Sequence, residues 1–401
     1  MNEIVISGIG IVSALGKNAA ETLESLREKR SGIARLHYLK TAHTEFPSGE
    51  IKMSNEEMIR SLNLSEDEPT TRTSMMGMLA VREALRHSGL TSQSSEIAKK
   101  KVALVSGTTV GGMDKSEQYY LDFLENDTKN AYISLHDCGA CTEMIADHFG
   151  IFSTVDTIST ACSSAANAIL FGAELLKNGR AEIVVAGGSE CITKFHLNGF
   201  NTLKILDTES SRPFDATRAG LNLGEGAAYV VMQTADGAKK SQVKQICQLS
   251  GYANTCDAFH QTTSSPNGEG AFLAMKKALE NAGLRPHDID YINAHGTGTD
   301  NNDASEGIAI IRLFGDKIPP VSSTKSFTGH AASAAGSIES VISILALQHN
   351  FIPVNLNFTK QMPELSFAPA TNEKPTKPMR HVLSNSFGFG GNDTCLIFSK
   401  M

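Results

Sequence analysis

The sequence predicts an α/β protein in which two similar halves share one core. Short, almost continuously apolar runs alternate with segments of helical periodicity, a pattern typical of sheets that are covered by helices. The order of these elements recurs in the second part of the chain. With 401 residues, of which 41% are hydrophobic, the chain can bury a large core. We expect the halves to be residues 1–239 and 240–401, joined within 235–240.

Apolar runs rich in β-branched residues predict the strands of the first half. The expected strands are 1–6, 101–106, 155–159, 182–187 and 228–233. Helical spacing of apolar residues predicts helices over 73–87 and 162–178. Gly89 and Gly179 follow these helices, and a glycine that adopts a left-handed conformation is a common helix end.

The second half repeats the segments of the first, which indicates an internal duplication and not a short-period repeat. Three pairs of segments correspond: 101–106 with 290–294, 155–165 with 321–331, and 224–231 with 390–397. The turn after residue 321 is therefore the counterpart of the turn that contains Cys162. If a pseudo-twofold axis relates the halves, these two turns can meet at one site.

Composition disfavours several functional classes. The net charge of −7, from 43 acidic and 36 basic residues, argues against a nucleic-acid binder. No run approaches the roughly 20 apolar residues that span a bilayer, and the N-terminus does not resemble a signal peptide. Seven scattered cysteines without a secretory signal predict reduced thiols in the cytoplasm and not a disulfide framework.

Cys162 is the candidate nucleophile. It lies where an apolar strand ends and a helix of small residues begins, in Ser159–Ala165. We expect the helix N-terminus to favour the thiolate and its free N–H groups to stabilise an oxyanion. The alternative is a buried structural cysteine, which is the commoner fate of an isolated cysteine in a helix.

The other cysteines carry weaker signals. Cys138 and Cys141 form a lone CxxC, without the second ligand pair of a metal site and without thioredoxin-like flanks, so we interpret their spacing as coincidence. The remaining four lie in or beside apolar runs and are predicted to pack in the core: Cys191, Cys247, Cys256 and Cys395.

Two histidines and a lysine occupy turns of the second half. His295 follows a strand and precedes Gly-Thr-Gly-Thr, which is a favourable position for a cleft. Lys325 and His330 lie in the turn that corresponds to the Cys162 turn, and Glu339 follows at a distance that allows pairing with Lys325. The alternatives are structural or surface histidines and a solvated lysine.

Together these motifs resemble a known family. The segments TACSS (160–164), HGTGT (295–299), KSFTGH (325–330) and NSFGFGGN (385–392) are similar, in order, to those of the elongating β-ketoacyl-acyl-carrier-protein synthases. The resemblance covers essentially the whole chain. It implies the thiolase-like fold, in which two duplicated α/β halves stack as five αβαβα layers.

The resemblance also implies roles for individual residues. Cys162, His295 and His330 correspond to the family's catalytic triad, and Lys325 with Glu339 to its supporting pair.

Further roles follow from the same motifs. Phe389 matches the gating phenylalanine, whose loop supplies an oxyanion N–H. Thr297 and Thr299 match residues that hold the phosphopantetheine arm, and Asp303 and Glu306 match structural acids.

Carrier proteins are acidic, so a family member needs a positive docking surface. Lys204 and Lys129 match basic docking positions, and Arg72 is a candidate to join them. Ordinary solvated charges are the alternative for all three.

The implied reaction is a decarboxylative Claisen condensation by an acyltransferase. An acyl group on Cys162 is joined to a malonyl unit on the carrier protein. No cofactor or metal is expected, because the phosphopantetheine belongs to the carrier, and the family expectation is a dimer.

Three other identities are weighed. One is the active subunit of a heterodimer with a chain-length factor. A non-catalytic chain-length partner would lack the nucleophile. A thiolase would need a second cysteine as acid/base, and Cys395 lies past the Gly-rich motif where it does not fit.

Several positions depart from the usual fatty-acid enzymes. They are Ala219, the polar run 300–303, Asp393, the small residues 331–333 and the segment 133–138. Some lie where the family places its acyl pocket and dimer interface. We therefore hypothesise a specialised pathway, such as polyketide or aryl-polyene synthesis.

Overall fold

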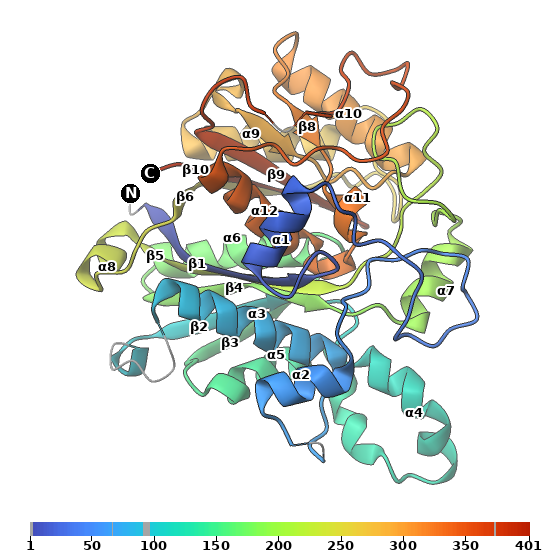
Figure 1. The fold of residues 1–401 in the computed structure, drawn as a ribbon. Helices are drawn as coiled ribbons and strands as arrows, with labels where there is room; N and C mark the ends of the chain where they lie inside the picture. The colour runs from blue at the N-terminus through green and yellow to red at the C-terminus, as the bar shows by residue number, and fades with distance from the viewer. Residues whose placement is uncertain (1–2, 66, 91–96, 373) are drawn as a thin grey trace.

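Ten strands form one mixed sheet in the computed structural model, which describes residues 3–65, 67–90, 97–372 and 374–401 (Figure 1). The strand order is β3-β2-β4-β5-β1-β6-β10-β9-β7-β8. The strands are β1 (Ile4–Ser13), β2 (Val102–Gly107), β3 (Thr154–Ile158), β4 (Ile183–Glu190), β5 (Gly226–Thr234), β6 (Cys247–Cys256), β7 (Tyr291–Asn293), β8 (Val321–Ser322), β9 (His381–Gly388) and β10 (Asn392–Ser399).

The order of the sheet is symmetric about the pairing of β1 with β6. Counting outward from this seam, β5 matches β10, β4 matches β9, β2 matches β7 and β3 matches β8. The directions also agree, since β2 runs parallel to β3 and β4, as β7 does to β8 and β9. The three segment correspondences expected from the sequence are thus confirmed as equivalent places in the sheet. The expected junction at 235–240 forms a short helix, α8.

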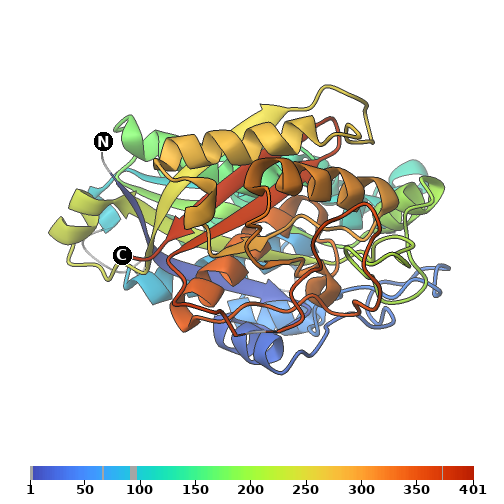
Figure 2. The same ribbon diagram turned by 90° about the horizontal axis from the view of Figure 1, so that it is seen from above.

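Helices cover the sheet in the layers that the resemblance implied (Figures 1 and 2). On the outside of the first five strands, α3 packs against β1 and β5, with α2 and α5 beside it. The middle layer, between the two groups of strands, consists of α6 and α12. On the outside of the second group, α9 covers β6 and β10 and lies next to α10. The α-helices are α1 (Ala19–Arg27), α2 (Asn55–Leu62), α3 (Arg72–Ser88), α4 (Met113–Glu125), α5 (Cys138–Phe149), α6 (Ser164–Lys177), α7 (Lys194–Thr202), α8 (Ala235–Lys240), α9 (Glu269–Ala282), α10 (Asp300–Phe314), α11 (Lys325–Thr328) and α12 (Ala335–His349).

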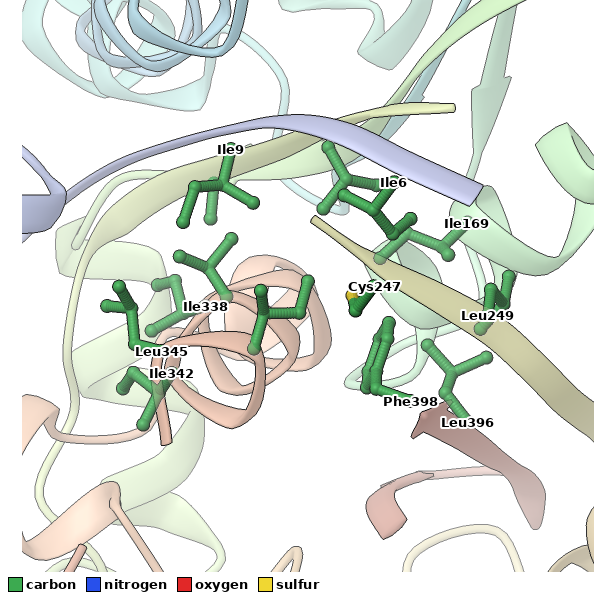
Figure 3. Close-up of a cluster of buried hydrophobic side chains, with 14 of the residues drawn as sticks. Ile6, Ile9, Ile169, Cys247, Leu249, Ile338, Ile342, Leu345, Leu396 and Phe398 are labelled. Carbon is green, nitrogen blue, oxygen red and sulfur yellow. The ribbon is translucent and has the colours of Figure 1, made fainter. Parts of the chain in front are cut away.

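The middle layer joins the halves. Ile9 of β1 lies over Ile338 of α12, and Ile6 of β1 lies beside Ile169 of α6 and Cys247 of β6 (Figure 3). Ile342 of α12 and Phe398 of β10 belong to the same buried cluster. α12 lies in the centre, since its residues from Ala335 to Leu347 are all buried; its apolar side chains fill this cluster and its one carboxylate, Glu339, is paired with Lys325. This cluster makes one core from two halves.

Most predicted elements are observed with ends shifted by a few residues. α3 spans the predicted helix 73–87 and ends at Gly89, whose φ of 74° is left-handed. Of the predicted strand 1–6, Met1 and Asn2 lie outside the described residues. No helix in the described part of the chain is long and apolar enough to cross a membrane.

The expectation that every strand is covered on both faces is wrong for β3. Val155 is 37% exposed, and Thr154 beside it is also exposed. β3 lies at one edge of the sheet and, among the described strands, pairs only with β2. The apolar content of a strand therefore does not by itself predict how deeply the strand is buried.

Candidate active site

Cys162 lies in a sharp turn between β3 and α6. Ala161, just before it, has a φ of 51°, in the left-handed region that disfavours residues other than glycine. α6 begins two residues later, and Cys162 is buried with only 6% of its surface exposed. The turn therefore presents the thiol at the start of a helix, as the sequence predicted.

His330 contacts the thiol directly. Its Nε2 lies 3.2 Å from Cys162 Sγ, although 168 residues separate the two in the chain. The backbone N–H of His330 donates to the Asn222 carbonyl at 2.7 Å. Among the described residues, its Nδ1 has no hydrogen-bond partner. The ring faces His295 edge-on, with 5.3 Å between the ring centroids.

Lys325 fixes the orientation of His295. Its Nζ donates to the backbone carbonyl of His295 at 2.6 Å, approaches His295 Nδ1 at 3.2 Å and forms an ion pair with Glu339. These three partners match the three protons of an ammonium group. Because Nδ1 must then accept, the ring proton of His295 resides on Nε2. Lys325 is buried, so the alternative of a solvated lysine is wrong.

Glu306 holds the backbone beside His295. One carboxylate oxygen accepts the His295 N–H at 2.9 Å, and the other accepts the Gly296 N–H at 2.8 Å. Asp303 similarly accepts the N–H groups of Phe214 and Gly298. The two acids thus shape the turn that presents His295.

Burial dominates the electrostatics of the site. It raises the pKa of the Cys162 thiol to about 11, while the Lys325 charge and the Phe389 N–H act in the opposite direction. Burial also lowers the pKa values of His295 and His330, and Lys325 lowers both further. It raises the pKa of Glu339 to about 7 against the opposing effect of Lys325. Burial of the thiol thus opposes the thiolate that the helix start is expected to favour.

A cavity of about 290 Å³ opens onto the three side chains. Thr297 and Thr299 line it, with their hydroxyl oxygens 2.9 Å apart. Phe389 lines it as well and stacks on Phe200 of α7, with ring centroids 6.1 Å apart. Lys204, just after α7, lies at the edge of the same cavity. The cavity thus gathers Cys162, His295, His330, Thr297, Thr299, Phe389 and Lys204.

The other two basic candidates lie elsewhere. Lys129 follows α4, is exposed, and places its ammonium 5.8 Å from the Tyr119 ring. Arg72 is buried at the start of α3 and pairs with Glu225 at 2.6 Å. A docking role for Arg72 is therefore wrong, because a buried, fully paired guanidinium offers no charge to a partner.

Two further polar groups near the catalytic residues, Glu190 and His196, escaped the sequence analysis. Glu190, at the end of β4, is fully buried and accepts hydrogen bonds from Thr109 and, across the halves, from Ser333. His196 of α7 is buried beside Phe200. The one signal in the sequence was the carboxylate of Glu190 at the end of an apolar strand, and that signal does not indicate which residues the carboxylate contacts.

All seven cysteines are free thiols. Cys141 is buried and lies 3.3 Å from the Thr71 hydroxyl, and Cys138 is half-buried at the start of α5. The prediction of core packing is confirmed for Cys191, Cys247 and Cys395 but is wrong for Cys256, which is exposed at the end of β6.

Known proteins resemble this chain over its full length. Residues 1–238 match the β-ketoacyl synthase N-terminal domain and residues 246–359 match its C-terminal domain. The 3-oxoacyl-[acyl-carrier-protein] synthase 2 of Coxiella burnetii is 33% identical, over 99% of this chain and 98% of that protein.

Solved structures agree. The ishigamide ketosynthase/chain length factor superposes with a TM-score of 0.92 at 27% identity, over 100% of this chain and 99% of that one. The ketosynthase ApeO of Xenorhabdus doucetiae, solved with its chain length factor ApeC, gives 0.87 at 28% identity, over 100% and 98%. On this evidence the chain belongs to the β-ketoacyl synthase family.

Proposed function

We propose that this protein joins an acyl group held on Cys162 to a malonyl unit carried by an acyl carrier protein, with loss of carbon dioxide. The observation that carries the proposal is the convergence of Cys162, His295 and His330 on one cavity, with His330 Nε2 at 3.2 Å from the sulfur. The chemistry needs no resident cofactor or metal, because the phosphopantetheine arm arrives with the substrate. We place the reaction in the cytoplasm, where seven free thiols stay reduced.

The first step transfers the acyl group to Cys162. Because burial keeps the thiol protonated, His330 Nε2 accepts its proton as the sulfur attacks the thioester carbonyl. The N–H groups of Cys162 and Phe389 are suited to the oxyanion, since the Phe389 N–H already points at Cys162 Sγ. The carrier thiol then leaves with a proton.

The second step forms the new carbon–carbon bond. Loss of carbon dioxide from the malonyl thioester leaves an enolate, whose oxygen needs hydrogen-bond donors. His295 supplies one from Nε2, the tautomer that Lys325 selects. His330 gave the thiol proton to the carrier and is again neutral with its proton on Nδ1; it supplies the second donor from Nε2 after solvent exchange has removed the Nδ1 proton and placed one on Nε2. The enolate carbon then attacks the acyl carbonyl on Cys162, and the thiolate leaves.

A radiolabel assay tests this function. The protein is incubated with acyl and [3-¹⁴C]malonyl carrier proteins; labelled carbon dioxide reports the lost carboxyl group, and mass spectrometry detects the β-ketoacyl product. We expect both from the native protein, no condensed product from Cys162→Ala, and a loss of at least about 100-fold in carbon dioxide release from His295→Ala. Carbon dioxide release without a β-ketoacyl product from the native protein would contradict the proposal.

Lys204 is proposed as a docking residue for the carrier protein. It is exposed at the rim of the cavity, where an acidic partner would approach. Lys129 is proposed as a second, more distant contact. Lys204→Glu should raise KM for the carrier substrate but leave the rate with a small pantetheine thioester unchanged. Lys240→Glu, on α8, is the matched control.

We further propose that the exposed edge of β3 pairs with a homologous chain. Val155 of β3 is itself 37% exposed at this edge. Other apolar side chains of the first half are exposed as well, among them Tyr120 (60%) and Leu121 (67%) of α4. The partner is either a second copy of this chain or a chain length factor. The second possibility is supported by the two solved ketosynthases described above, each of which is named together with a chain length factor. Sedimentation of the protein alone and after co-expression with a chain-length-factor homologue distinguishes them.

The acyl substrate is proposed to belong to a specialised pathway. The polar run 300–303 follows the threonines of the cavity, and Asp300, Asn301 and Asn302 line its wall. Single-turnover acylation of Cys162 by a panel of acyl carrier proteins tests this, and a clear preference for medium-length saturated chains would defeat it.

A further inference from the structure

Two segments that are distant in the chain form neighbouring walls of the catalytic cavity. Asp300, Asn301 and Asn302, at the start of α10, line one wall. The other wall belongs to the loop that follows β6, here called the 257–265 loop; His260, Thr262, Thr263 and Ser264 of this loop line the cavity. The chemistry described so far assigns no role to the Asn301 side chain.

Asn301 bridges the two walls with both ends of its amide. The Ser264 N–H donates to Asn301 Oδ1 at 2.8 Å, and Asn301 Nδ2 donates to the Ser264 carbonyl at 3.1 Å. The turn that carries Asn301 is itself fixed from behind. Arg218 donates from Nε to the Thr299 carbonyl and from Nη2 to the Asp300 carbonyl. Asn301 is thus a rigid two-point clamp on Ser264.

The clamped loop in turn holds the loop that contains Phe389. The Gly390 N–H donates to the Gln261 carbonyl at 2.7 Å, and the Asp257 N–H donates to the Gly391 carbonyl at 2.8 Å. Phe389 lies directly before these glycines, and its own N–H points at Cys162 Sγ. Hydrogen bonds and short stretches of backbone therefore connect Asn301 to Phe389, whose ring stacks on Phe200.

We propose that Asn301 is a positioning residue that keeps Phe389 closed over Cys162 and sets the width of the cavity mouth for the arm of a carrier-bound thioester. Its amide acts through Ser264 and Gln261 on Gly390 and touches no reacting atom. The role in substrate binding rests on the condensation proposed above. The role in closing the site over Cys162 does not depend on which reaction the site performs.

Two variants and a control test this role. Asn301→Ala removes both hydrogen bonds to Ser264, and Asn301→Asp keeps only the acceptor. Asn267→Ala is the control, since Asn267 is exposed and, among the described residues, its side chain hydrogen-bonds only to Glu269, at 3.5 Å. The readouts are the rate of Cys162 alkylation by iodoacetamide, followed by mass spectrometry, hydrogen exchange of the Ser264 amide, and KM and kcat with malonyl carrier protein.

We expect Asn301→Ala to speed Cys162 alkylation and Ser264 exchange by about tenfold, because two hydrogen bonds that restrain the loop are lost. For Asn301→Asp, the rates of Cys162 alkylation and Ser264 exchange should lie between those of Asn301→Ala and those of the native protein. KM for the carrier substrate should rise about fivefold with kcat nearly unchanged, since the arm loses a preformed mouth. A merely structural role would instead lower kcat at constant KM, as the folded fraction falls.

The outcomes separate this inference from the proposed function. Alkylation and exchange rates within about twofold of those of Asn267→Ala would overturn the positioning role, because a loop released from its clamp must open more often. If Asn301→Ala does not fold, Asn301→Asp decides by the same criterion. Absence of carbon dioxide release from the native protein would refute the condensation alone, because the alkylation contrast needs no substrate.

Discussion

Burial and a single imidazole set the reactivity of Cys162. A cysteine at a helix start is expected to be acidic, but the thiol here is enclosed by the cavity wall and its pKa is raised to about 11. Desolvation of the thiolate outweighs both the nearby Lys325 charge and the Phe389 N–H. The nucleophile is therefore formed only when His330 takes the proton during attack.

The alkylation rate of Cys162 should consequently rise with pH without an early plateau. Between pH 7 and pH 10 we expect an increase of about tenfold per pH unit with iodoacetamide, because the thiolate fraction grows tenfold per unit below the pKa. Mass spectrometry of the Cys162 peptide gives the rate at each pH. A plateau reached below pH 8 would show that the resting site already holds a thiolate.

The ion pair of Lys325 with Glu339 is buried and therefore costly to disrupt. Lys325→Met should destabilise the protein by about 3–5 kcal/mol, because Glu339 is left as an uncompensated buried charge. The double variant Lys325→Met/Glu339→Leu should recover much of this loss in urea unfolding, yet remain inactive because the tautomer of His295 is no longer fixed.

An exposed ion pair serves as the control for these substitutions of Lys325 and Glu339. Lys276 and Glu280 of α9 lie 3.9 Å apart on the surface, and Lys276→Ala should change the free energy of unfolding by less than about 0.5 kcal/mol. Additive effects of the two core substitutions would mean that Lys325 and Glu339 do not stabilise each other.

At the scale of elements, close approach of β1 to α3 depends on glycine. A Cβ on Gly10 would lie 2.0 Å from the Ala80 carbonyl oxygen and 2.6 Å from the Ala84 nitrogen, both backbone atoms of α3. Neither atom can move without shifting the helix. The sequence shows the glycine but not the helix that requires it.

Gly10→Ala should therefore destabilise the protein by about 3 kcal/mol, because overpacking displaces backbone and not a flexible side chain. Ile11→Val in the same strand is the matched control and should cost about 1 kcal/mol. Thermal or urea unfolding of both variants provides the comparison. A Gly10→Ala variant as stable as the control would show that α3 can move away without cost.

At the scale of the molecule, the two halves are inseparable although each contributes five strands. α12 of the second half packs against β5 and α6 of the first as well as β9 of its own. Ile6 and Ile9 of β1 belong to this shared cluster (Figure 3). The boundary at 239/240 stays a prediction, and it falls near the end of α8.

Residues 1–239 expressed alone should not reach a native state, because the face that α12 covers would be exposed. We expect strong binding of a hydrophobic dye and no cooperative urea transition for this fragment. Co-expression with 240–401 should restore both the transition and Cys162 alkylation kinetics like those of the intact chain. Cooperative unfolding of the first fragment by itself would contradict a shared core.

The sequence by itself determined the α/β class, the duplication and the identity of the candidate residues. These features depend on local periodicity and on short motifs, such as the turn at Cys162 and the glycine that ends α3, and such signals are readable one segment at a time. Even the equivalence of β2 with β7 and of β5 with β10 was available, because each pair keeps its own local pattern.

Only the tertiary structure decided which groups are buried together. Solvation and distance fix the pKa of Cys162, the partner of Arg72, the exposure of β3 and the clamp of Asn301 on Ser264, and both are properties of residues far apart in the chain. A motif identifies the side chain, but the residues that exclude water from it or hydrogen-bond to it come from distant parts of the sequence. That is why the residues of this site were predictable and their protonation and restraint were not.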